Sequence, residues 1–386
     1  MKKSSSQSLF TVKRIFVAGF AMFAMFFGSG NLVFPLLIGK SAMGQYPWAI
    51  SGFVISGVVI PFLGLLGILL YNGSYMNFFA RLGKVVSFVL IFFLLSLVGP
   101  FGVIPRCITV SYGSFLTLFP ETPLAIFSFL MCVLVFFLSV RENKVVPLLG
   151  TILAPAKILS VGFIVLFGFL YAAQPALSTL TDTQAFKSGL YEGYQTMDLM
   201  AAFFFATVVM NYLVKSQNED SQESPLMFKT AVGAMLIGGG LMSAVYLGMV
   251  YLGATYASDL GSARPEQFLA VIAHISLGAL SGKIVTAAIV LACLTTAIAL
   301  TTTFTDFVYE HLFKKRFERS HCLAMSTLIS FVFSTFGFSG IAGYLGPILS
   351  ALYPLLIVYT LFNIGAWIWE NYLKKSTFSN NTICNK

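Results

Sequence analysis

Ten mostly apolar stretches in this chain are each long enough to cross a lipid bilayer as a helix. A membrane-spanning helix needs about 20 predominantly apolar residues. By this criterion, spans are predicted at about 14–38, 48–71, 86–111, 123–140, 145–172, 190–214, 227–254, 284–313, 321–338 and 343–370. Hydrophobic residues make up 58% of the chain and charged residues only 10%, a balance that a water-exposed surface could not carry. The sequence therefore predicts an all-α polytopic membrane protein.

Lysine and arginine residues mark the side of the membrane on which each connection lies. They precede the first span and follow every even-numbered span, and the opposite connections hold only Lys40, Lys187, Arg264 and Lys283. By the positive-inside rule, both termini are predicted to be cytoplasmic, as an even number of spans requires. The net charge of +9 thus reflects orientation and not nucleic-acid binding. The outer connection at 255–283 contains PEQFLAVIAHISLGAL, whose periodicity predicts a helix over the outer mouth.

Ten spans divide into two sets of five, and the second copy of an odd-numbered repeat must lie upside down in the membrane. The sequence thus predicts one transmembrane domain over 1–386, with short polar tails and a 5+5 inverted repeat of about 13–172 and 190–372. Secondary transporters with such repeats commonly have discontinuous helices near the bilayer midplane. A channel is the alternative class, because half-helices and hydroxyl rings also build ion filters. A channel would give flux without saturation.

Two polar, glycine-containing runs are the expected helix breaks. The run GSGN at 28–31 lies within the first span, where glycine costs about 1 kcal/mol per helix position relative to alanine. The alternative is that these glycines permit close helix packing, but Gly28 and Gly30 lie on different helix faces. The second break is expected at 193–198, at the start of the sixth span. The sequence therefore predicts that helices 1 and 6 are broken.

Five stretches, in order, resemble signatures of the branched-chain amino acid:cation symporter family, within the amino acid, polyamine and organocation superfamily. They are FFGSGNLVFP, VGPFGVIPRCITVSY, LAPAKI, GYQTMD and ACLTTAIALT. The resemblance covers almost the whole chain and implies the ten-helix core of the bacterial leucine transporter fold. It also implies import of leucine, isoleucine or valine by sodium symport, across a bacterial plasma (inner) membrane. Members commonly have twelve spans; the two that this sequence lacks lie outside the repeat core, so the oligomeric state stays open.

The two breaks together are the expected substrate site. The first would expose the backbone amides of 29–32 at the positive end of a half-helix, which suits a carboxylate. The predicted substrate-binding residues are Gly28, Ser29, Gly30, Asn31, Thr196, Met197 and Asp198. A charged side chain within the membrane costs at least about 2.5 to 3.5 kcal/mol, which favours a functional role for Asp198. The alternative is that Asp198 caps the helix that begins near Leu199.

The resemblance also implies a cation site between the first and eighth spans. Its ligands would be the hydroxyls of Thr295 and Thr296 and backbone carbonyls of Ala24, Phe27 and Ala292. By the same resemblance, Asn31 would offer its side-chain oxygen to a cation beside the substrate. An all-oxygen shell of this kind suits a hard monovalent cation such as sodium.

Lys157, in the fifth span, offers an alternative coupling ion. In some proton-coupled relatives in the superfamily, a lysine on this helix places its ammonium where the sodium would be. A buried lysine can release its proton near neutral pH, because burial disfavours the charged form. Lys157 could instead bond the carbonyl that Pro155 leaves without its helical partner, or extend toward an interface.

Enzymatic chemistry finds no support in the sequence. It contains no Ser/His/Asp order, phosphate-binding loop or paired carboxylates, and its five cysteines are widely spaced. We therefore expect no enzyme activity, no cofactor and no metal beyond the coupled cation, with amino acid substrate and membrane lipid as the partners. Arg106, which follows Pro105 in the third span, is expected to pair with a carboxylate or to bond freed carbonyls.

Overall fold

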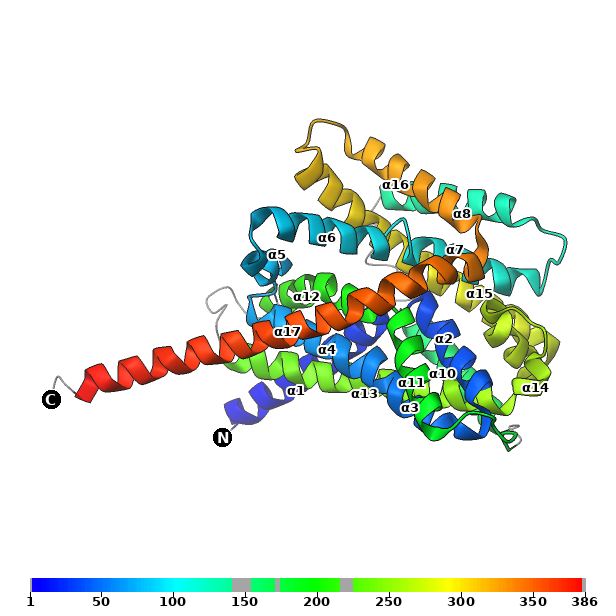
Figure 1. Ribbon diagram of the computed structural model, residues 1–386, viewed down its shortest axis with the longest axis horizontal. Coiled ribbons are helices and arrows are strands. Elements are labelled where there is room, and N and C mark those ends of the chain that lie inside the picture. Colours follow the sequence, from blue (N-terminus) through cyan, green and yellow to red (C-terminus); the bar gives the residue numbers. More distant parts are fainter. Residues whose placement is uncertain (1, 141–153, 171–173, 216–224, 384–386) are drawn as a thin grey trace.

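The computed structural model describes residues 2–140, 154–170, 174–215 and 225–383, and within these ranges the chain is helical, with short connections and no strands (Figure 1). The longer helices are α1 (Lys2–Phe26), α2 (Ser29–Ala42), α3 (Tyr46–Val54), α4 (Ile60–Leu70), α6 (Lys84–Val98), α7 (Val103–Leu116), α8 (Leu124–Val140), α10 (Ala154–Leu170), α11 (Asp182–Gln195), α12 (Asp198–Lys215), α13 (Pro225–Thr255), α15 (Phe268–Phe307), α16 (Arg319–Ser334) and α17 (Gly337–Ile383). The shorter elements are α5 (Tyr75–Phe79), α14 (Ala257–Leu260), η1 (Met43–Gln45), η2 (Ile55–Val59), η3 (Ala80–Leu82), η5 (Pro265–Gln267) and η6 (Val308–Leu312).

Five helical segments of the described chain are long and apolar enough to cross a membrane. They are Ser29–Leu70, Lys84–Leu116, Phe228–Thr255, Lys283–Leu312 and Gly337–Asn371. Shorter apolar helices cover Arg14–Phe26, Leu124–Val140, Leu159–Leu170 and Asp198–Thr207. The expected fifth span begins at 145, outside the described residues, so the count of ten spans stays a prediction.

The third expected span, 86–111, is not one continuous helix. The chain turns between α6 and α7, at the sequence GPFG. A Cβ at Gly102 would lie 2.1 Å from the carbonyl oxygen of Leu97, so only glycine fits this turn. Lys84–Leu116 is nevertheless long and apolar enough to cross a membrane. The turn within it was not predicted, because apolar composition alone does not register a local turn.

Two helix pairs pack with their backbones in contact. A Cβ at Gly189 of α11 would lie 2.1 Å from the carbonyl oxygen of Ala49 in α3. A Cβ at Gly39 of α2 would lie 2.0 Å from the carbonyl oxygen of Val250 in α13. Glycine allows this close approach between membrane helices. Helices α1 and α12 also pack on α13 and α4, so that α1 to α4 and α11 to α13 form one packed group, here called the first unit.

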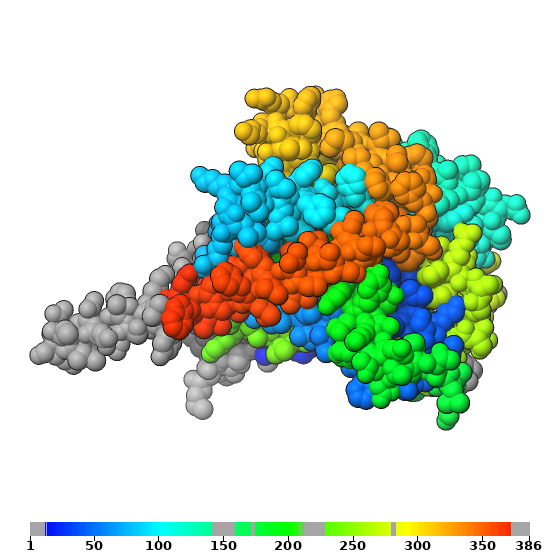
Figure 2. Space-filling model, viewed as in Figure 1, coloured from blue at the N-terminus to red at the C-terminus, as the bar shows by residue number. Residues whose placement is uncertain are grey.

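A second unit consists of α7, α8, α15 and α16. Helix α7 packs against α15, and α8 packs against α16. In Figure 1 this unit lies above the first, and α17 crosses diagonally between them. Helix α17 contacts α4 on one side and α7 on the other, and Figure 2 shows it covering this face of the contact between the units.

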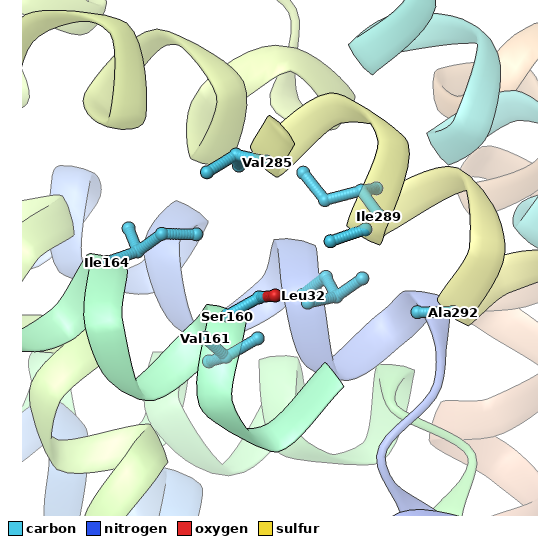
Figure 3. A pocket seen from close by; sticks show the side chains of 8 residues that line it. Leu32, Ser160, Val161, Ile164, Val285, Ile289 and Ala292 are labelled. Carbon is cyan, nitrogen blue, oxygen red and sulfur yellow. The ribbon is translucent and has the colours of Figure 1, made fainter. Parts of the chain in front are cut away.

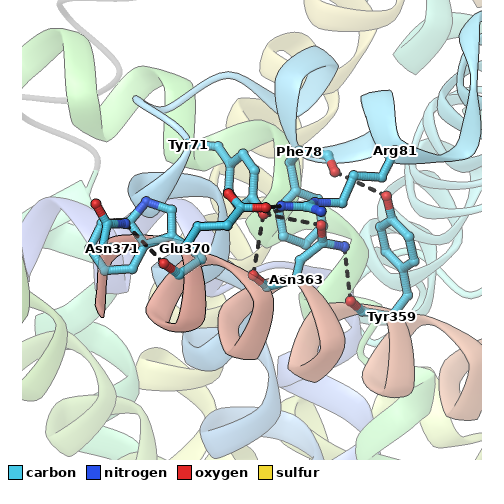
Figure 4. A network of polar contacts seen from close by, with 8 residues as sticks. Tyr71, Phe78, Arg81, Tyr359, Asn363, Glu370 and Asn371 are labelled. Carbon is cyan, nitrogen blue, oxygen red and sulfur yellow. Dashed lines mark hydrogen bonds and ion pairs between the residues drawn. The ribbon is translucent and has the colours of Figure 1, made fainter. Parts of the chain in front are cut away.

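Polar contacts join residues 363–370, within α17, to the connection after α4 (Figure 4). The Arg81 guanidinium forms an ion pair with Glu370, with 2.6 Å between Nη2 and Oε1. Its Nε donates to the Tyr71 hydroxyl, which in turn donates to the carbonyl oxygen of Asn363 at 3.2 Å. Because the Arg81 and Glu370 side chains are partly exposed, this pair positions α17 more than it stabilises the fold.

The segment predicted to be helical at 265–280 is helical, as η5 and the first turns of α15. It packs against α2 and α7. Lys40 of α2 contacts this segment and the connection before it: its Nζ lies 4.8 Å from the centre of the Phe268 ring and donates to the carbonyl oxygen of Gly261 at 2.7 Å. The helix then bends at Gly278, whose φ of 77° lies in the left-handed region.

Candidate substrate and ion site

The first break lies at Phe27 and Gly28, where α1 ends and α2 has not yet begun. Gly28 is extended, and its N–H donates to Asn31 Oδ1 at 2.9 Å. In a continuous helix this N–H would bond the carbonyl of Ala24, four residues earlier. Asn31 therefore ends the helical bonding of α1, and it releases the Ala24 carbonyl from its usual partner.

The start of α2 is buried and polar. Ser29 and Asn31 are at most 1% exposed, and the apolar residues 32–38 of the same helix follow them. The first N–H groups of a helix have no partner within it, and they lie at the positive end of the helix dipole. This end of α2 can therefore receive an anion such as a carboxylate.

The second break lies at Thr196 and Met197, between α11 and α12. Met197 is buried, and its φ of 64° is a backbone conformation that residues other than glycine rarely adopt. Asp198 begins α12 and is 2% exposed, so its carboxylate lies at a positive helix end. This position fits both the capping role and the functional role considered above.

The fold brings the two breaks into contact. Asn31 Nδ2 donates to Asp198 Oδ2 at 2.7 Å, across 167 residues of sequence. A Cβ at Gly30 would lie 3.1 Å from the Cα of Thr196, so the two backbones touch here. The predicted substrate residues of both halves therefore lie in one buried cluster.

Tyr246 of α13 completes this cluster, and sequence reasoning missed it. Its hydroxyl donates to Asp198 Oδ2 at 3.1 Å and also accepts from Asn31 Nδ2. Tyr246 is one of two tyrosines in an apolar helix, and no spacing or motif marks it as part of a site. Two donors thus hold one carboxylate oxygen of Asp198. The cluster can therefore bind a positively charged group at Asp198, next to the start of α2, which attracts negative charge.

The expected cation ligands of α15 lie together. The hydroxyls of Thr295 and Thr296 both donate to the Ala292 carbonyl, at 2.7 and 3.2 Å. A Cβ at Gly28 would lie 3.5 Å from Thr296 Cγ2, so this part of α15 faces the first break. Phe27 is fully buried at the same break.

A small apolar pocket adjoins these ligands (Figure 3). It lies between α2, α10 and α15, and is lined by Leu32, Ser160, Val161, Ile164, Val285, Ala288, Ile289 and Ala292. Ala292 therefore faces protein on this side and not lipid. The side chain of Lys157, on α10, lies outside the described residues, so its role as a proton carrier stays a prediction.

Arg106 donates a hydrogen bond to a backbone carbonyl, which is one of the two interactions expected for it from the sequence. Its Nη1 donates to the carbonyl oxygen of Gln195 at 2.6 Å, and its Nη2 donates to Gln195 Oε1 at 3.0 Å. Gln195 ends α11, directly before the second break. Sequence reasoning missed Gln195, because nothing local distinguishes it from other polar residues of the same helix.

Comparison with known proteins identifies the family. Residues 11–384 match the family model described as branched-chain amino acid transport protein. The branched-chain amino acid permease BraB of Bacillus subtilis (strain 168) is 33% identical over 358 residues, which cover 90% of this chain and 79% of BraB. The permease BrnQ of Escherichia coli (strain K12) is 29% identical over 371 residues, which cover 92% of this chain and 81% of BrnQ.

Solved structures identify the fold. The inward facing conformation of Mhp1 matches with a TM-score of 0.60 at 13% identity, over 89% of this chain and 75% of Mhp1. MhsT in complex with L-phenylalanine matches with a TM-score of 0.54 at 17% identity, over 90% of this chain and 88% of MhsT. Both have the bacterial leucine transporter fold, and at these identities the likeness concerns the fold alone. The chain is therefore a multi-pass membrane transporter, not an enzyme, and it belongs to the branched-chain amino acid transport protein family.

Proposed function

We propose that this protein imports leucine, isoleucine and valine across a bacterial inner membrane by symport with sodium. The observation that carries the proposal is the bond between Asn31 and Asp198, which joins two helix breaks inside a buried site. A zwitterion fits this site, with its carboxylate at the start of α2 and its ammonium at the Asp198 carboxylate. The apolar side chain of the substrate would lie against the apolar residues around the site. One methylene changes the binding free energy in such a pocket by only about 1 to 3 kcal/mol, so leucine, isoleucine and valine should compete for the same site.

We propose that the ten expected spans form the 5+5 inverted repeat, with both termini in the cytoplasm. The helix contacts support this proposal. In the proposed repeat, α2 and α11 belong to equivalent first helices, and α3 and α13 to equivalent second helices. The symmetry of the repeat then turns the α2–α13 contact into the α11–α3 contact, and the structure contains both. The α10–α13 and α17–α4 contacts exchange in the same way, as do α10–α15 and α17–α7.

The sodium ion is proposed to lie among the Ala24, Phe27 and Ala292 carbonyls and the two threonine hydroxyls. Asn31 supports this site indirectly, since its Oδ1 takes the N–H of Gly28 and so leaves the Ala24 carbonyl available. On binding, the threonine hydroxyls would turn from the Ala292 carbonyl, which they now both bond, toward the ion. A site built from neutral oxygens would bind the ion reversibly.

Uptake of labelled leucine into proteoliposomes under imposed ion gradients tests the proposed function. We expect saturable uptake that an inward sodium gradient stimulates and that isoleucine and valine inhibit. Flux that rises without saturation would instead identify a channel. Saturable uptake that an inward proton gradient drives without sodium would identify proton coupling.

Thr296→Val should remove sodium stimulation while preserving the shape of the side chain. We expect the sodium concentration for half-maximal uptake to rise by at least about tenfold, because one oxygen ligand is lost. Thr303→Val is the matched control: Thr303 lies on the same helix, bonds the Ala299 carbonyl in the same way and is exposed. Equal sodium dependence of the two variants would count against the site.

The variant Lys157→Met distinguishes sodium coupling from proton coupling. If sodium drives transport, the variant should retain a sodium-dependent leucine current, because no titratable group is needed on α10. The current would be measured by solid-supported membrane electrophysiology at fixed pH. Loss of all uptake in this variant, together with proton-driven and sodium-independent uptake in the wild type, would transfer the coupling role to Lys157.

A further inference from the structure

Arg106 is a buried cation that connects the two units of the fold. It is 1% exposed, and it is held by the two bonds to Gln195 and by the Phe34 ring, whose centre lies 5.0 Å from its Cζ. Among the described residues, no carboxylate lies within ion-pair distance of it. Its charge is therefore met directly by a helix end, a side-chain amide and an aromatic face, and at longer range by the Glu192 carboxylate of α11.

These contacts cross from one unit to the other. Arg106 lies on α7, which packs on α15 in the second unit. Gln195 on α11 and Phe34 on α2 belong to the first unit. Any motion that separates α7 from α2 and α11 must therefore break the contacts of Arg106.

The contacts of Arg106 lie on one particular side of the substrate site. Gln195 precedes the second break, and Phe34 follows the first, so they belong to the half-helices α11 and α2, whose far ends join the connections at 174–181 and 43–45. The connection at 256–267, between α13 and α15, lies at the same end. Those connections meet at one end of the molecule, since the Gly44 N–H donates to the carbonyl oxygen of Ala176 at 2.9 Å and Lys40 reaches Gly261. By the proposed orientation, this is the outer side.

We propose that Arg106 is an outer latch, a positioning residue that holds the substrate site closed toward the outside and releases Gln195 when the site opens. This proposal rests on the proposed function and orientation. The forked guanidinium reaches the backbone carbonyl and the side-chain amide of Gln195 together, which the single ammonium of lysine cannot do in the same geometry. Its buried Nε has no hydrogen-bond partner in the described structure, which limits the stability of the closed latch and so allows opening.

Cys107 supplies a natural reporter of the latch. Its thiol is buried beside Arg106, and Sγ lies 3.4 Å from Ser29 Oγ at the first break. Opening of α7 from α2 would expose it. The experiment uses the full chain with Cys132, Cys293, Cys322 and Cys384 replaced by alanine, and a membrane-impermeant maleimide applied to right-side-out and to inverted vesicles.

Arg106→Gln should accelerate labelling of Cys107 by at least about tenfold from the outside, because the latch loses both charge-assisted bonds. Labelling from the inside should not accelerate. Gln195→Leu, which keeps the backbone carbonyl, should give a smaller acceleration, and Arg106→Lys should lie between wild type and Arg106→Gln. Arg264→Gln is the matched control, since it removes an exposed positive charge from an outer connection, and it should label at the wild-type rate.

Wild-type labelling rates in both Arg106→Gln and Gln195→Leu, in protein that remains monodisperse in detergent, would overturn the latch. Equal acceleration from both sides would also overturn it, because that indicates general loosening. The labelling is done without amino acid, so it does not depend on the cargo. Addition of leucine and sodium is a separate arm: failure to alter Cys107 labelling in the wild type, with the Arg106 effect intact, would count against the proposed substrate and not against the latch.

Discussion

Gly30→Val should abolish leucine uptake while the protein still inserts and folds. The Cβ alone would lie 3.1 Å from the Cα of Thr196 and 3.3 Å from its carbonyl oxygen, a tighter contact than ordinary side chains make. The two further methyl groups of valine would force α2 away from the second break. This would lengthen the Asn31–Asp198 bond and crowd the amides proposed to bind the carboxylate. Uptake by proteoliposomes at equal protein density is the measurement.

Gly240→Val is the matched control for this prediction. Gly240 lies in the membrane helix α13, is exposed, and nothing lies within 4 Å of where its Cβ would be. The same chemical change there should leave uptake near the wild-type level. Wild-type uptake by Gly30→Val, in a preparation with normal abundance, would remove the first break from the substrate site.

Asp198→Asn should raise the leucine concentration for half-maximal uptake by about 10- to 100-fold, which is the effect of losing a charged hydrogen-bond partner. The asparagine keeps the shape of the side chain but carries no charge for the substrate ammonium. Tyr246→Phe should have a smaller effect in the same direction, because it removes one donor to Asp198 and leaves the charge. Initial rates over a range of leucine concentrations distinguish the two variants.

Asp259→Asn provides the comparison, since it removes a negative charge from an exposed position in the connection before η5. It should leave the kinetics unchanged. If Asp198→Asn also has unchanged kinetics and reduces only the abundance of the protein, then Asp198 acts as a helix cap and the ammonium is bound elsewhere.

Sequence alone identified the features that depend on residues close together along the chain. Apolar stretches of sufficient length predicted helices across the membrane, because the bilayer requires each span to satisfy its own backbone. The interruption at GSGN was expected near residue 28, and the helix stops at Phe26 and resumes at Ser29. The polar GYQTMD run likewise contains the gap between α11 and α12. In both places the local chemistry that opposes a helix is visible in a few consecutive letters.

Only the tertiary structure decided which side chains meet at those breaks. Asn31 and Asp198 are 167 residues apart, Arg106 and Gln195 are 89 apart, and Tyr246 reaches Asp198 from 48 residues away. These contacts depend on the rotation and separation of packed helices, which close glycine contacts such as Gly39 on Val250 help to set. A periodic apolar pattern gives the length of a helix in lipid, but lipid and protein neighbours are equally apolar, so the pattern does not determine which face turns inward. The residues of the two breaks were therefore identified from the sequence, whereas their contacts with each other and the contributions of Tyr246 and Gln195 followed from packing.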